Sequence, residues 1–197
     1  NMIPRVFAAV VRVATVPRSL VAYEVGAMGP SKDCAYEGPY MKAIAGVPIS
    51  MEGRTAACAH LSPVGNISQA VCDAWSNESV QNIRLLSAFA PVVSVEQLTY
   101  DCRLMNTAGA EGPNGLRRLR DWLSASDAAL DPQAYVLHPE VVLRLSREIM
   151  QAPDAYGRTV RAVRATVAEL RSAAASKTLS LAPRELSWLD RIAKEAD

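Results

Sequence analysis

The chain has 197 residues, of which 50% are hydrophobic and 21% charged, so it can bury a core and is not expected to be disordered as a whole. Its formal net charge is +1, which argues against a protein dedicated to nucleic acid binding. Four cysteines are too few for a disulfide scaffold. Because the sequence begins with Asn1 and is regularly patterned at once, we expect it to be a piece of a longer protein.

The N-terminal residues predict an apolar helix over 6–28 that Pro17 divides or kinks. Arg12 and Arg18 interrupt the apolar run, so we expect no signal peptide. The longest strongly apolar run, at 85–95, is about half of the ~20 residues that a bilayer span requires. Run length therefore predicts no membrane span.

The segment 29–40 is the most unusual part of the sequence, because Gly-Pro pairs mark both of its ends as a loop. It places Cys34 among Asp33, Tyr36 and Glu37. A thiolate at this position can bind zinc or act as a nucleophile. The alternative is an ordinary, partly buried cysteine. The neighbouring carboxylates disfavour a thiolate unless a cation such as a bound metal compensates them.

A second candidate site follows at Cys58 and His60, whose side chains share a face only if they lie on a strand. Packing is the simpler interpretation of both residues, because their spacing is not that of a zinc finger. Around them we expect a short helix at 40–45, a buried strand at 47–51, and a helix over 62–83 that starts near Ser62-Pro63.

The middle of the chain predicts an amphipathic helix that begins with a capping box at 94–97. Cys102 lies on the apolar face of that helix, and Cys72 occupies a similar position in the helix before it, so both are interpreted as core residues. The glycines and proline at 109–115 predict a break. His138 precedes a proline near a helix start and is interpreted as structural.

Beyond the break, helices are expected to dominate. Their apolar faces are Leu116, Leu119 and Leu123, then Val142, Leu145 and Ile149, then Val160, Val163, Val167 and Leu170. Four arginines lie mostly away from the last stripe: Arg158, Arg161, Arg164 and Arg171. A solvated helix face is favoured over an anion-binding role for them. A last short helix is expected over 180–193.

Seven segments match one known family in order along the chain, at 14–24, 29–37, 49–53, 58–60, 75–80, 100–107 and 131–135. The first two read ATVPRSLVAYE and GPSKDCAYE. The match is dense from 14 to 108 and then thins. These segments resemble the zinc-containing subunit of methanol:corrinoid methyltransferases.

The resemblance implies an α/β fold of the TIM-barrel type, of which this chain is the C-terminal, predominantly helical part with few short strands. Residues 1–108 would then form the C-terminal part of the catalytic barrel. Residues 109–197 would form a helical segment that packs on it.

The family activates methanol on zinc and transfers its methyl group to the cobalt(I) corrinoid of a partner protein. Its zinc is held by one glutamate and two cysteines. By resemblance the last of these ligands is Cys34, and the other two precede this chain. We expect Asp33, Tyr36 and Glu37 to orient the ligand.

The resemblance further implies a cytoplasmic enzyme that forms a homodimer within a hetero-oligomer with the corrinoid protein, and that contacts neither nucleic acid nor membrane. Two alternatives stay open. One is a related zinc methyltransferase for another methyl donor, and the other is a non-catalytic helical scaffold subunit.

Overall fold

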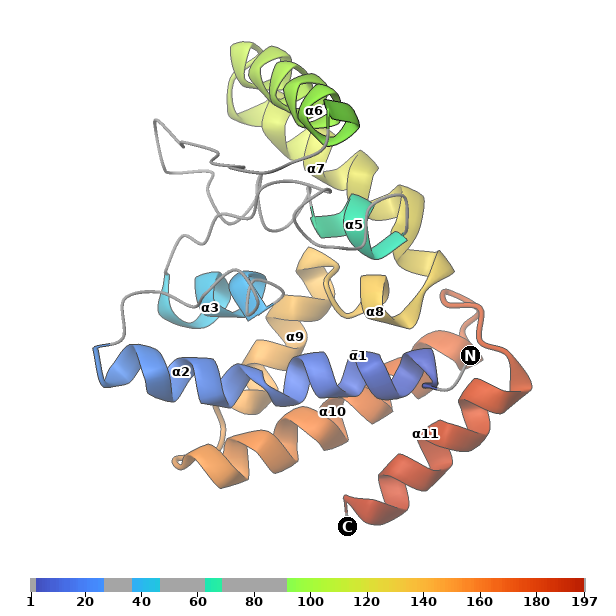
Figure 1. Cartoon of the computed structure of the whole chain (residues 1–197). Helices are drawn as coiled ribbons and strands as arrows, with labels where there is room; N and C mark the ends of the chain where they lie inside the picture. Colours follow the sequence, from blue (N-terminus) through green and yellow to red (C-terminus); the bar gives the residue numbers. More distant parts are fainter. Residues whose placement is uncertain (1–2, 27–36, 47–62, 69–91, 197) are drawn as a thin grey trace.

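The computed structural model describes residues 3–26, 37–46, 63–68 and 92–196. All regular secondary structure in these residues is helical (Figure 1). The strand expected at 47–51 and most of the helix expected at 62–83 lie outside the described residues. The helical character of the chain is therefore confirmed where the structure describes it, whereas the short strands stay a prediction.

Proline sets the starts of many of these helices. The elements are α1 (Arg5–Ala14), α2 (Val16–Glu24), α3 (Gly38–Ala45), α5 (Pro63–Ser68), α6 (Val92–Ala110), α7 (Pro113–Asp127), the 3-10 helix η3 (Ala128–Leu130), α8 (Pro132–Tyr135), α9 (Pro139–Ile149), α10 (Ala155–Ala175) and α11 (Pro183–Glu195). Proline occupies the first or second position of α2, α3, α7, α8, α9 and α11. At these positions it costs no helical hydrogen bond, and its fixed φ suits the first turn.

Helices α1 and α2 form a nearly continuous rod that crosses α10 (Figure 1). Its division falls at Thr15, just before Pro17, which confirms the predicted helix break. The inner face of the rod packs on α10, α8 and α11 and buries Val6, Ala9, Val10, Val13, Val16 and Leu20. Glu185 of α11 accepts the backbone N–H groups of Arg5 and Val6 at 3.2 and 2.8 Å, which satisfies donors at the start of α1.

The same rod has the length and composition of a membrane span, over the 20 residues Arg5–Glu24. Run length predicts no span, whereas the length and composition of the whole rod would allow one, because its charged residues are few and widely spaced. However, 44% of the apolar window is buried inside the structure. The packing of its inner face on α10 is that of a core helix in a folded domain.

Helix α10 lies at the centre of the helical body and contacts α1, α2, α9 and α11. Its buried residues are Ala162, Thr166, Val167, Leu170 and Ala173. The predicted stripe is confirmed at its second half, but Val160 and Val163 are only half-buried. Helices pack on several sides of α10, so small side chains such as Ala162 are enclosed where neighbouring helices approach closely.

Helices α6 and α7 form a hairpin at one end of the molecule (Figure 1). Helix α6 begins at Val92, so Ser94 lies in its first turn and the predicted capping box is wrong. Only Glu111 and Gly112 connect the two helices, which makes the break shorter than the predicted 109–115. A left-handed φ of 76° at Gly112 reverses the chain there.

Short helices join the hairpin to the helical body. Helix α5 contacts α7, α8 and η3, while α3 packs on α2 and α9. The face predicted for α9 is confirmed, since Val142, Leu145 and Ile149 are all buried. Residue 108, the expected end of the first part of the chain, lies within α6. The division of the chain into two parts stays a prediction.

Candidate functional site

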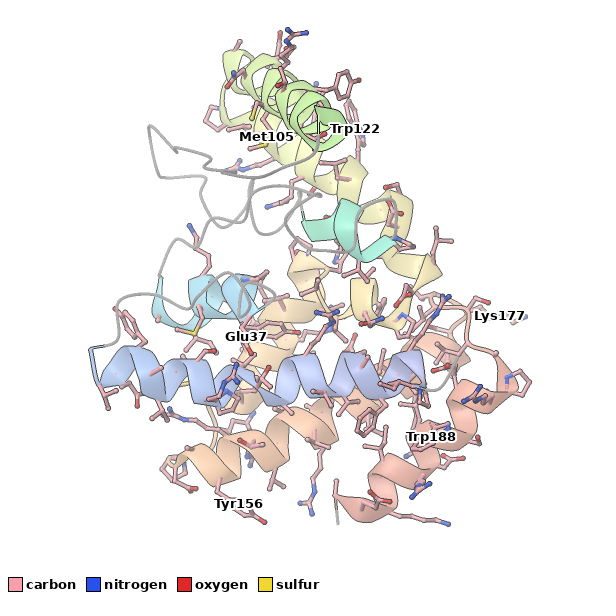
Figure 2. All side chains as sticks on the ribbon, viewed as in Figure 1. Glu37, Met105, Trp122, Tyr156, Lys177 and Trp188 are labelled. Carbon is pink, nitrogen blue, oxygen red and sulfur yellow. The ribbon has the colours of Figure 1, made fainter. Side chains whose placement is uncertain are left out.

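The loop predicted to carry the metal ligand ends where α3 begins. Its residues Asp33, Cys34 and Tyr36 lie outside the described residues. Glu37 is described and directly precedes α3 (Figure 2). The structure therefore shows how the far end of this loop is held, and by which helix.

Glu37 is anchored to α2 by both of its carboxylate oxygens. Oε2 accepts a hydrogen bond from the Ser19 hydroxyl at 2.8 Å, and Oε1 pairs with Nη2 of Arg18 at 3.3 Å. The Glu37 residue is only 4% exposed, and Ser19 is buried as well. A buried carboxylate requires such partners, because an unpaired one would pay a large desolvation cost. Glu37 is therefore a structural anchor for the end of the loop.

Tyr40 provides a second anchor three residues further along the chain. Its hydroxyl donates to the carbonyl oxygen of Val136, between α8 and α9, at 2.6 Å. The ring is fully buried, and this burial raises the pKa of Tyr40 well above its ordinary value. The phenol therefore stays protonated and keeps its donor role. The chain leaving the loop is fixed to α2 at Glu37 and to the α8–α9 connection at Tyr40.

The described residues do not by themselves form a metal site. Among them no group of three or more histidine, cysteine, aspartate or glutamate side chains is arranged to hold an ion. Glu37 faces Arg18 and Ser19, which identifies it as an anchor and not as a metal ligand. The alternative candidates Cys58 and His60 lie outside the described residues.

Two of the remaining candidates are described, and neither belongs to a site. His138 is the N-cap of α9, where its Nδ1 accepts the N–H of Glu140 at 3.3 Å, so its structural interpretation is confirmed. Cys102 is half-buried on α6, and so less enclosed than the predicted core position. Cys72 lies outside the described residues.

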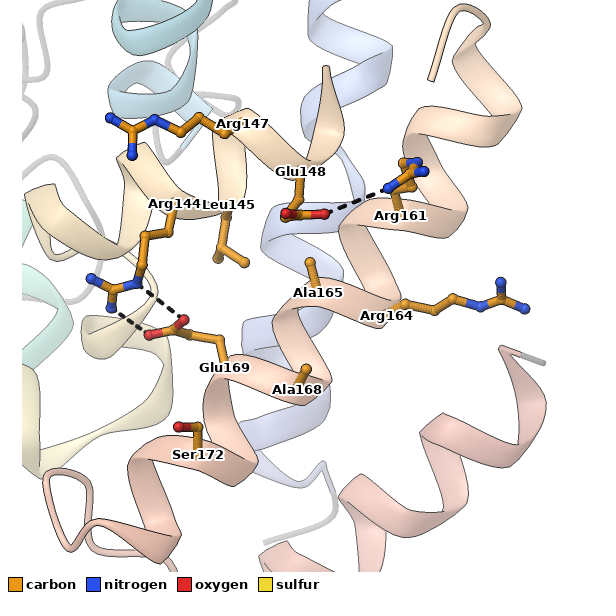
Figure 3. Close-up of a pocket in the computed structure, with 10 residues that line it drawn as sticks. All are labelled: Arg144, Leu145, Arg147, Glu148, Arg161, Arg164, Ala165, Ala168, Glu169 and Ser172. Carbon is orange, nitrogen blue, oxygen red and sulfur yellow. Dashed lines mark hydrogen bonds and ion pairs between the residues drawn. The ribbon is translucent and has the colours of Figure 1, made fainter. Parts of the chain in front are cut away.

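A surface groove of about 820 Å³ lies between α9 and α10 (Figure 3). The sequence analysis did not predict it. At one end Glu169 accepts the Tyr135 hydroxyl at 2.9 Å and Nε of Arg144 at 3.2 Å. At the other end Glu148 pairs with Arg161 at 3.5 Å. Residues of the first cluster are up to 34 positions apart in sequence, so no local spacing could have revealed it.

These contacts set the protonation of the first cluster. Burial raises the pKa of Glu169, but hydrogen bonds from Arg144 and Tyr135 outweigh burial, and the pKa is lowered overall. Burial and the same carboxylate raise the pKa of Tyr135 to about 12. Near neutral pH the cluster therefore holds a carboxylate, a guanidinium and a neutral phenol. This is a structural ion pair that joins α8, α9 and α10.

The solvated face predicted for the α10 arginines is confirmed at Arg161, Arg164 and Arg171, which are exposed, whereas Arg158 is half-buried. All four also make contacts that their spacing did not predict. Arg158 pairs with Glu24 at 3.2 Å, and Arg161 pairs with Glu148. Arg171 pairs with Asp190, and Nε of Arg164 donates to the carbonyl oxygen of Ala196 at 2.9 Å. These side chains connect α10 to α2, to α9, and to α11 and the residue after it. The reason is that α10 is surrounded by helices, so its polar flanks face neighbours that supply acceptors.

Comparison with known proteins assigns the chain to a family. The family model described as methanol-cobalamin methyltransferase B subunit matches residues 1–197. The chain belongs to this family. One relative, the methanol–corrinoid protein co-methyltransferase of Methanosarcina barkeri, is 46% identical to this chain over 147 residues. Those residues are 75% of this chain and 32% of the relative.

A solved structure extends the likeness to three dimensions. The chain matches part of the methanol:cobalamin methyltransferase complex MtaBC from Methanosarcina barkeri with a TM-score of 0.80 at 38% identity. The match covers all of this chain and 42% of that one. The chain thus spans about a third of the curated relative and less than half of the solved chain, and it shares the fold of that part.

Proposed function

We propose that the chain is part of a subunit that takes the methyl group of methanol and passes it to the cobalt(I) corrinoid of a partner protein. The match of the family model over residues 1–197 carries this proposal. The names of the relative and of the solved complex, which specify methanol, a corrinoid protein and cobalamin, support it. The barrel expected from the resemblance, the homodimer and the cytoplasmic location belong to the same proposal.

Zinc belongs to this proposal through Cys34. A zinc ion held partly by this thiolate would stabilise the methanol oxygen while the methyl group leaves. The other ligands are proposed to lie in the portion of the relatives that this chain does not span. Asp33 and Tyr36 are proposed to surround the ligand, as the resemblance implies.

The contribution of the described residues is to position the loop. Glu37 fixes the chain three residues after Cys34 to α2, and Tyr40 fixes the next turn to Val136. A ligand-bearing loop that is tied at its end loses less conformational freedom when its thiolate engages a metal. The two anchors restrict the chain at Glu37 and Tyr40, and this supports the proposal that Cys34 takes part in binding the metal.

The decisive experiment compares Cys34→Ala with Cys102→Ala in the full-length protein that contains these residues. Bound zinc is measured by elemental analysis, and methylation of cob(I)alamin by methanol is followed by absorbance. We expect Cys34→Ala to lose most of both, and Cys102→Ala to keep both. Normal zinc and activity in Cys34→Ala would overturn the ligand assignment.

A complementary measurement uses residues 1–197 alone. One thiolate cannot build a site of three protein ligands, so we expect this chain to bind zinc weakly. Tight, stoichiometric zinc uptake that is lost in Cys58→Ala would instead assign the site to Cys58 and His60. Offering other methyl donors in place of methanol tests the substrate part of the proposal.

A further inference from the structure

The outer face of the α1–α2 rod carries a stripe of apolar side chains. The inner face of the rod is buried against α8, α10 and α11. Residues on the other side recur at spacings of three or four positions, which places them on one helical face. This outer stripe comprises Ile3, Phe7, Val11, Ala14, Arg18, Val21 and Val25. Its five large apolar residues are between 38% and 78% exposed.

Helix α11 widens the stripe near the start of α1. The Phe7 ring meets the Trp188 ring of α11 edge-on, with 6.2 Å between the ring centroids, and Arg191 lies over the Trp188 ring at 4.8 Å. Trp188 is half-buried. Single exposed apolar side chains are common on monomeric proteins, whereas a continuous apolar surface that extends over two elements marks an interaction site. We therefore expect the outer stripe to lie in an interface.

The charge within the stripe favours protein over lipid as its cover. The rod, Arg5–Glu24, is long and apolar enough to cross a membrane, so lipid is the competing occupant. However, Arg18 lies within the stripe and not at its end, and its guanidinium pairs with Oε1 of the buried Glu37 at 3.3 Å. A charged residue inside a membrane is costly, whereas an arginine paired with a carboxylate is common in protein interfaces.

The length of the relatives indicates which protein segment covers the stripe. This chain matches only 42% of the solved chain, with a TM-score of 0.80, so more than half of that relative lies outside the matched part. Permanent interfaces resemble a domain core divided in two and are more apolar than transient ones. The outer stripe has that composition, because Arg18 is the only charged residue among its seven members.

We propose that the outer stripe packs against the portion of the full-length subunit that this chain does not span. The rod then contacts two parts of the protein. Its outer stripe meets that portion, while Ser19 and Arg18 hold Glu37 at the end of the Cys34 loop. The rod thereby positions the Cys34 loop relative to the remaining zinc ligands, a consequence that rests on the proposed function, which assigns those ligands to the same portion.

The test labels introduced thiols in the full-length protein that contains these residues. Val11→Cys and Val21→Cys place a thiol on the outer stripe, and Tyr23→Cys is the matched control. Tyr23 lies two residues after Val21 and so on the opposite side of α2, and it is 47% exposed against 38% for Val21. The rate of maleimide labelling is measured by mass spectrometry of the peptide that contains the thiol. Each rate is divided by that of the same variant unfolded in urea.

We expect both stripe thiols to react at least about tenfold more slowly than the Tyr23→Cys thiol, because a thiol packed in an interface is inaccessible to the reagent. Equal rates at all three positions would overturn the proposal, and added phosphatidylcholine vesicles then show whether lipid covers the stripe instead. Protection that disappears when the protein is diluted to a monomer assigns the stripe to a second copy of the subunit and also overturns the proposal.

Bound zinc separates the interface from the proposed function. Val21→Asp should lose most of the zinc of the full-length protein, whereas Tyr23→Asp should keep it, with circular dichroism as the check on folding. Full zinc in Val21→Asp would show that the rod does not position the Cys34 loop. A wild-type protein without zinc would contradict the proposed function and leave the interface intact, because the labelling of the stripe does not depend on the metal.

Discussion

Ser19 on α2 donates its hydroxyl hydrogen to Oε2 of Glu37 at 2.8 Å, across 18 positions of sequence. Both residues are buried, and Arg18 adds an ion pair to the other carboxylate oxygen. The contact joins the helix before the predicted ligand loop to the residue that ends it. The position at which the chain leaves the loop is therefore fixed from α2.

Replacing Glu37 should destabilise the protein by more than an ordinary surface ion pair would. Glu37→Ala leaves the buried Ser19 hydroxyl without its acceptor, so we expect a loss of about 1.5–3 kcal/mol in the free energy of unfolding, measured with urea. Glu24→Ala is the matched control, because Glu24 is 55% exposed in its pair with Arg158. It should cost at most about 1 kcal/mol. Equal losses in the two variants would show that Glu37 is no anchor.

Acidification should weaken the start of α9 through His138. Burial lowers the pKa of His138, and its Nδ1 must be unprotonated to accept the N–H of Glu140. Because the folded pKa lies below the unfolded one, this contribution is present above the unfolded pKa, about 6.5, and is lost as the pH falls.

The measurement compares thermal unfolding of wild type and His138→Asn between pH 7.5 and 5.5. Asparagine caps helices without titrating in this range, so the variant should lose less stability on acidification, by up to about 1 kcal/mol. If the stability of the two proteins depended on pH in the same way, His138 would not be the cause of the loss on acidification.

Close packing in the α6–α7 hairpin makes Gly115 hard to replace. A Cβ atom added at Gly115 would overlap the carbonyl oxygen of Ala108, and a backbone atom cannot swing away as a side chain can. We expect Gly115→Ala to cost about 1–3 kcal/mol of unfolding free energy. Gly109→Ala is the control, since nothing lies within 4 Å of its added Cβ. The free energy of unfolding of that variant should rise by about 0.5–1 kcal/mol, because alanine favours a helix more than glycine does. A rise in both variants would contradict the close approach of Gly115 to the backbone of Ala108.

Much of the helical body was predictable because its signals are local. Proline near a helix start and an apolar residue every three to four positions act within one or two turns. These local signals predicted the helix break near Pro17, the start of α5 at Pro63 and the buried face of α9. The capping box at Ser94 failed because a helix can begin one turn earlier than a short motif suggests.

The candidate site, too, was predictable only where its signals are local in the sequence. Ordered matches such as GPSKDCAYE singled out Cys34 and the family from the sequence. The anchoring of Glu37 by α2 had no local signal, because its partners Arg18 and Ser19 lie on an earlier helix and meet it only when that helix packs against the start of α3.

The sequence by itself determined the family, the cysteine to test and the starts of some of the helices, such as α5 at Pro63. Only the tertiary structure decided what the arginines of α10 do. Their spacing favoured a solvated face over an anion site and could not reveal contacts between helices. Packing α10 among α2, α9 and α11 brought Glu24, Glu148 and Asp190 within reach of them. Periodicity reports which face of a helix is apolar, whereas the partner of a charged side chain depends on where the neighbouring helices lie.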